Sequence, residues 1–230
     1  AYVYYSVGDY ALVANTTGAY NSALGNNALG ANTTGSYSTA VGYLALTTNN
    51  GSENTAVGRE CLESNSTGIL NTAVGNRTLE NNTTGNYNTA IGANALDANT
   101  TGANNTAVGY NAMTSNTTAN NNSAFGHSSL EANTTGYHNI AIGNYALQNT
   151  TTGFKNTACG YSALNDNTTG ENNTAVGYNA LDANTTGNTN TAVGYDALGA
   201  ATICNNNTAI GFQALDAIVD NQHHATAVGA

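Results

Sequence analysis

The sequence predicts an all-β protein, a parallel β-solenoid (β-roll) of about fourteen stacked coils with about 17 residues each and no helix. Three observations lead to this prediction. A short phrase ending in glycine returns at a nearly constant interval, two apolar positions recur within each interval, and asparagine recurs with them. The composition suits a repeat of turns and short strands, because 41 Asn, 36 Thr and 26 Gly stand among 230 residues, and Pro and Trp are absent.

The repeat unit is built on Thr-Ala-Val-Gly and its variants. Its glycine returns every 17 residues, except for an interval of 16 between Gly42 and Gly58 and one of 18 between Gly211 and Gly229. One unit carries too few large apolar residues to fold alone, so we expect the units to stack and share a core. The whole chain, residues 1–230, is therefore predicted to be a single repeat domain.

A second glycine, usually from Asn-Thr-Thr-Gly, lies ten residues after the first, as Gly85 does after Gly75. Two glycines and paired threonines in each unit disfavour a helix, whereas the segments around Asn-Thr-Ala-Val and Asn-Ala-Leu suit short strands. Glycine at fixed places indicates a backbone requirement in every coil, either a turn or a positive φ.

Two apolar columns form the predicted core. The residue before the first glycine is apolar in all fourteen units, and Leu stands four residues after that glycine in twelve of thirteen units. We expect both columns to be buried, each with a preceding small residue that is usually Ala. The chosen core residues are Val41, Val57, Val74, Ile91, Val108, Val176, Val193, Leu62, Leu96, Leu164 and Leu181.

Two asparagine columns are expected to form ladders. Side chains stacked in register can hydrogen-bond amide to amide from one coil to the next. The first column, four residues before the first glycine, includes Asn54, Asn71, Asn88, Asn105 and Asn173; the second, three residues before the second glycine, includes Asn82, Asn99 and Asn133. N-glycosylation is the alternative, because Asn-Thr-Thr is an acceptor sequence.

Aromatic residues follow the first glycine in four successive units, Tyr161, Tyr178, Tyr195 and Phe212. Such a stripe could stack on sugars or on a neighbouring chain. It could equally be a packed ladder that stiffens the solenoid. Of the functional uses, lateral self-association is the one we expect.

Charge excludes several classes of partner. The net charge is −10 and only Arg59, Arg77 and Lys155 are basic, so the chain lacks the basic footprint that nucleic acid requires. The same balance speaks against anionic membrane surfaces, and no apolar run is long enough for membrane insertion. Six acids share one column, five residues after the first glycine, which we expect to be a solvated outer corner; calcium bridging is the alternative.

No catalytic, metal or cofactor site is predicted. Cys61, Cys159 and Cys204 occupy an Ala, a Val and a Gly position of the repeat, as small apolar substitutes would. The four histidines have no carboxylate or serine at a recurring catalytic spacing. An enzyme is therefore not expected.

The units Asn54–Gly58, Asn105–Met113 and Asn173–Leu181 resemble the Ala-Ile-Gly repeats in the heads of YadA-type trimeric autotransporter adhesins. The longer phrase with Asn-Thr-Thr-Gly also resembles repeats of phage tail fibres and related surface fibres. The resemblance covers essentially the whole chain, although the adhesin repeat is shorter than 17 residues. It implies a β-roll or solenoid, often trimeric, that is extracellular, on a cell surface or on a virion.

These observations predict a structural or adhesive extracellular fibre whose partner is another copy of itself, joined end to end, as a homotrimer, or both. The alternative is a binding surface, such as a phage receptor-binding shaft, a glycan-binding adhesin with a host-surface receptor, or an ice-binding solenoid. The paired threonines are adjacent, so strand alternation would turn them to opposite faces, and a flat Thr-x-Thr face is not indicated from them.

Overall fold

A computed structural model describes residues 4–218 and 223–229. It divides into two compact units, Ala1–Thr118 and Ala119–Ala230, which we describe separately. Each is a parallel β-solenoid with one short strand per coil and a period of about 17 residues, as the sequence predicts, and the described residues contain no helix. Consequently no described segment is a helix that could cross a membrane.

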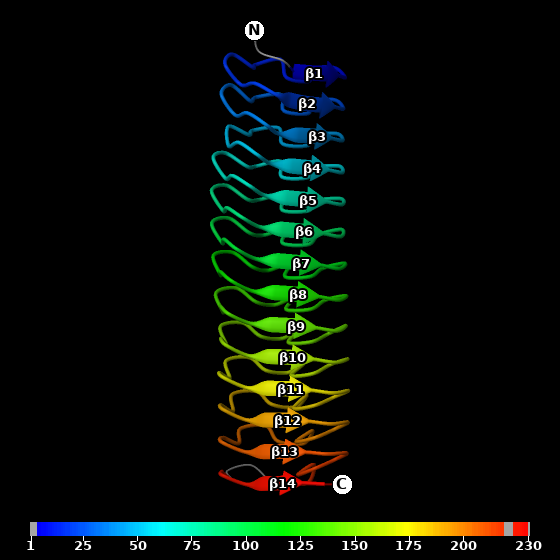
Figure 1. Ribbon diagram of the computed structural model, residues 1–230, viewed down its shortest axis with the longest axis vertical. Helices are drawn as coiled ribbons and strands as arrows, with labels where there is room; N and C mark the ends of the chain where they lie inside the picture. The colour runs from blue at the N-terminus through cyan, green and yellow to red at the C-terminus, as the bar shows by residue number, and fades with distance from the viewer. Residues whose placement is uncertain (1–3, 219–222, 230) are drawn as a thin grey trace. The chain divides into compact units, whose positions relative to one another are not determined.

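Within the described residues each unit contains seven strands, which follow one another in chain order (Figure 1). The N-terminal unit contains β1 (Tyr4–Val7), β2 (Asn21–Leu24), β3 (Thr39–Val41), β4 (Thr55–Val57), β5 (Thr72–Val74), β6 (Thr89–Ile91) and β7 (Thr106–Val108). The C-terminal unit contains β8 (Ser123–Phe125), β9 (Ile140–Ile142), β10 (Thr157–Cys159), β11 (Thr174–Val176), β12 (Thr191–Val193), β13 (Thr208–Ile210) and β14 (Thr226–Val228).

Equivalent residues of successive coils lie side by side. In the N-terminal unit Thr55 pairs with Thr72, Ala56 with Ala73 and Val57 with Val74, all in parallel register. The turns between strands are also bonded from coil to coil, as where the Leu62 N–H donates to the Thr78 carbonyl at 3.0 Å. Each coil therefore depends on its neighbours for most of its backbone hydrogen bonds.

The valine column is not in the core, and the prediction for Val41, Val57, Val74, Ile91, Val108, Val176 and Val193 is wrong. Strands such as β5, β6 and β12 show one pattern, in which Ala is buried between an outward Thr and an outward Val or Ile. Val74 is 37% exposed and Ile91 is 42% exposed, whereas Ala73 and Ala90 are fully buried. Neighbours on a strand point to opposite faces, so only one apolar residue of each pair can point inward. The alanine, which is the smaller of the two, points inward because leucine and asparagine side chains already occupy the interior.

The leucine column and the position before it fill the interior. Leu62, Leu96, Leu164 and Leu181 are fully buried, as are Ala95 and most of its equivalents. The leucines have a left-handed backbone, with φ of 52° at Leu62 and 53° at Leu96, a conformation that disfavours side chains. Burial of a large apolar side chain at each of these positions offsets that cost.

The two glycine rows meet different requirements. The first row has a positive φ, +141° at Gly58, where a Cβ would also collide with the carbonyl of Gly75 in the next coil. Glycines of the second row do not have positive φ. At Gly85 a Cβ would collide with the Asn82 Oδ1 and with the Gly102 carbonyl, so close packing of coils is what requires glycine there.

Another left-handed position lies at an exposed corner. One residue there, a threonine, is strained, and this strain can be tested. Thr189 has φ of 60°, although Asn occupies the equivalent position one coil before, at Asn172, and one coil after, at Asn206. Asn tolerates this region far better than a β-branched residue. We expect Thr189→Asn to raise the free energy of unfolding by about 1 kcal/mol, measured by urea denaturation. The exposed Thr186, which does not have positive φ, provides the control Thr186→Asn; an equal gain there would contradict the strain argument.

Candidate functional site

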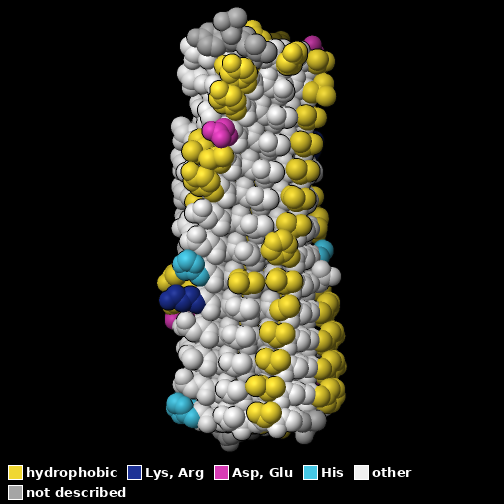
Figure 2. All heavy atoms as spheres, in the orientation of Figure 1, with side chains coloured by type: hydrophobic (Ala, Val, Ile, Leu, Met, Phe, Trp, Pro, Cys, Tyr) yellow, Lys and Arg dark blue, Asp and Glu magenta, His cyan; other side chains and the backbone are white. Residues whose placement is uncertain are grey.

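The outer face of the strands is an uncharged array of two columns. In β3 to β7 the first column is Thr39, Thr55, Thr72, Thr89 and Thr106, and the second is Val41, Val57, Val74, Ile91 and Val108. The threonines are partly exposed and the apolar residues are partly or largely exposed. Figure 2 shows apolar side chains gathered in columns on this side of the molecule. Residues that the sequence assigned to the core therefore form a candidate surface.

A second apolar column adjoins this face in the C-terminal unit. Tyr161, Tyr178, Tyr195 and Phe212 stack face to face, with ring centroids 5.2, 5.2 and 5.3 Å apart and interplanar angles of 12° or less. Each stands two residues after an outward strand residue, as Tyr178 does after Val176. We call these four rings, together with Cys159, Val176, Val193 and Ile210, the aromatic strip. The rings pack on one another as a ladder, and they are still 45–56% exposed.

The asparagine columns lie inside the solenoid and are bonded along their length. Asn88 Nδ2 donates to Asn71 Oδ1 at 3.2 Å and to the Gly102 carbonyl at 2.8 Å. In the second column Asn99 Nδ2 donates to Asn82 Oδ1 at 2.8 Å. Asn54, Asn71, Asn82, Asn88, Asn99, Asn105, Asn133 and Asn173 are all buried. A buried amide cannot carry a glycan in the folded chain, so at these positions asparagine serves the structure.

The paired threonines lie in the turn just before the second glycine, where they connect successive coils. The hydroxyl of the first member donates to the next coil, from Thr83 to the Thr100 carbonyl at 2.9 Å and from Thr100 to the Thr117 carbonyl at 3.0 Å. The second members, such as Thr84 and Thr101, are exposed. The pairs thus contribute one bonded residue and one exposed residue per coil, and they do not form a Thr-x-Thr face.

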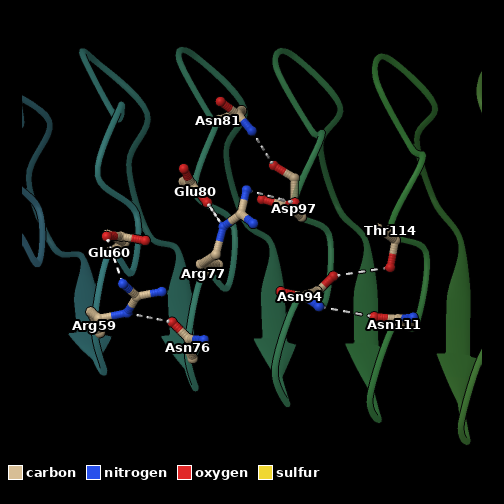
Figure 3. Close-up of polar contacts among 10 residues, drawn as sticks. All are labelled: Arg59, Glu60, Asn76, Arg77, Glu80, Asn81, Asn94, Asp97, Asn111 and Thr114. Carbon is tan, nitrogen blue, oxygen red and sulfur yellow. Dashed lines mark hydrogen bonds and ion pairs between the residues drawn. The ribbon is translucent and has the colours of Figure 1, made fainter.

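The acidic corner of the N-terminal unit is half-buried and is balanced by the chain's own arginines (Figure 3). Arg59 pairs with Glu60 at 3.2 Å, and Arg77 lies between Glu80 and Asp97, bonded to the first and 3.6 Å from the second. Burial raises the pKa of Asp97 to about 6, against the opposing effect of Arg77. Carboxylate oxygens of Glu60, Glu63 and Glu80 lie within 4.8 Å of one another, but with two guanidinium groups beside them they do not by themselves indicate a cation site.

Cys61, Cys159 and Cys204 form no disulfide among the described residues, and their surroundings differ. Cys61 takes the place of a buried alanine, and burial raises the pKa of its thiol to about 12. Cys204 is also buried, whereas Cys159 stands in the outward column between Ile142 and Val176 and is partly exposed. The outward column of the strands therefore carries a natural thiol, and the buried column that precedes leucine carries another.

Sequence reasoning located the columns but missed which of them faces solvent. The sequence held no signal to decide this, because an apolar residue beside a small one on a three-residue strand can point either way. Comparison with protein-family models, with curated proteins and with solved structures finds no match to this chain. Function must therefore be argued from these surfaces alone.

Proposed function

We propose that this chain is a structural, adhesive segment of an extracellular fibre, and that its copies associate sideways through the aromatic strip. The observation that supports the proposal is the strip itself, a run of stacked and half-exposed aromatic rings beside an outward aliphatic column. Contiguous exposed apolar patches on protein surfaces are typical of interaction sites. No catalytic function is part of the proposal.

The partner that fits the strip is a second copy of the chain. The strip residues carry no charge, while the chain as a whole has a net charge of −10, so two copies can approach here without bringing acids together. The rings of one strip can also pack their exposed edges against apolar atoms of the strip on a second copy. This arrangement agrees with the resemblance to trimeric adhesin heads and to tail fibres, in which chains associate side by side.

Sedimentation velocity of the full chain over a concentration series tests the proposal. We expect a mass above the 23.3 kDa of one chain that rises with concentration. The double variant Tyr178→Asn with Tyr195→Asn should weaken association about tenfold or more, because aromatic residues dominate such contacts. Asn is tolerated at this position, since Asn144 occupies it in an earlier coil of the same unit.

The matched control is Tyr137→Asn. Tyr137 is also exposed and stacked, on Phe154 at 4.8 Å, but it follows the second glycine and lies outside the strip. The Tyr137→Asn variant should associate as the wild type does, and its circular dichroism spectrum should be unchanged. A wild type that stays at the mass of one chain at every concentration would contradict the proposal, as would equal loss of association in the control.

A further inference from the structure

The strand face of the N-terminal unit carries a regular array from β3 to β7. From β3 to β7 five successive coils present Thr and then Val or Ile, with no interruption. In the C-terminal unit the pattern is broken by Phe125 in β8 and by Ile140 in β9. The column after the first glycine is also different in the N-terminal unit, where it holds Arg59 and Asn76 in place of a continuous aromatic stack.

This face forms a two-dimensional grid. Parallel pairing in register places equivalent side chains about 4.8 Å apart from coil to coil, and the two outward residues of one strand stand about 6.7 Å apart. The grid is supported from beneath, because the alanine of each strand is fully buried and the asparagine ladders connect the same coils. Its side chains are short and β-branched, so they have few rotamers.

The chemistry of the grid suits ordered water. Each threonine offers a hydroxyl that both donates and accepts, beside a methyl group, and each valine offers methyl groups alone. None of the ten side chains is charged, so the face complements a neutral lattice of water molecules better than an ionic surface. Two O–H···O bonds of about 2.75 Å that meet at one tetrahedral water span about 4.5 Å, which is close to the spacing of about 4.8 Å along each column. We propose that the outer face of β3 to β7 binds the surface of an ice crystal.

This surface is distinct from the aromatic strip, and so is its test. Thermal hysteresis, the gap between the melting and freezing temperatures of a single crystal, is measured on the full chain together with crystal shape. We expect a measurable gap and faceted crystals for the wild type. Thr72→Tyr and Thr89→Tyr should abolish the gap, because each ring stands above the plane of the grid. A ring is compatible with this column, since Tyr5 occupies it in β1.

The control is Thr84→Tyr, which places the same ring at an exposed threonine in the turn just before the second glycine. It should keep the full gap, and all variants should keep the circular dichroism spectrum of the wild type near 0 °C. A folded wild type without a gap or faceted crystals overturns the proposal. So does a control that loses the gap as the grid variants do. Association through the aromatic strip is read from sedimentation and is unaffected by either outcome.

Discussion

Replacing Ala90 by Asp is expected to unfold the coils around β6, whereas replacing its neighbour Ile91 by Asp should leave the fold intact. Ala90 is fully buried, and a carboxylate there would have neither room nor a cation. A buried unpaired charge costs about 3–5 kcal/mol. Ile91 is 42% exposed on the outer face, where a surface substitution changes stability by about 0.5 kcal/mol.

Urea denaturation followed by circular dichroism compares the two variants directly. Because the residues are adjacent and the new side chain is the same, their difference reports only which side of the strand each occupies. Equal losses of stability, or a greater loss for Ile91→Asp, would contradict the inward position of the alanine column.

The second large effect is expected from one rung of the asparagine ladder. Asn88→Leu removes the donor to Asn71 Oδ1 and to the Gly102 carbonyl, and it removes the Oδ1 that accepts the Asn105 N–H at 3.0 Å. The Asn71 Oδ1 keeps the Asn88 N–H and the Gly102 carbonyl keeps the Asn99 Nδ2, so the loss comes from the broken hydrogen bonds themselves. At about 1 kcal/mol for each bond, a loss of about 3 kcal/mol is expected. Thermal and urea denaturation measure it.

Asn76→Leu is the matched control for the ladder. Asn76 is exposed, and its side chain accepts a hydrogen bond from the exposed Arg59. Its replacement should change stability by about 0.5 kcal/mol or less. A ladder variant as stable as this control would show that the buried amides contribute little to the solenoid.

Most of the architecture could be predicted from spacing. A constant interval between glycines forces equivalent residues of successive coils into register, and from that register follow the parallel strands, the Asn71–Asn88 ladder and the stack of Tyr178 on Tyr195. Such features depend on what recurs and not on the detailed path of one coil.

The path within one coil could not be predicted in the same way. Thr-Ala-Val is equally compatible with either face inward, and the outcome depends on how much space the leucine and asparagine side chains leave inside. Likewise nothing in local propensity points to a left-handed backbone at Leu96, since leucine rarely adopts it. Only the coil as a whole determines these choices, and the candidate surfaces follow from them.

Both proposals depend on the claim that the valine column faces solvent, and the native thiol in that column tests it without any substitution. Cys159 stands in the outward column, while Cys61 stands in a buried alanine position and Cys204 is also buried. Alkylation of the folded protein at mildly alkaline pH, followed by peptide mass spectrometry, gives the rate at each site. We predict rapid labelling at Cys159 and protection of Cys61 and Cys204 until the chain unfolds. Labelling of Cys61 as fast as Cys159, or protection of Cys159 with Cys61 exposed, would contradict the account.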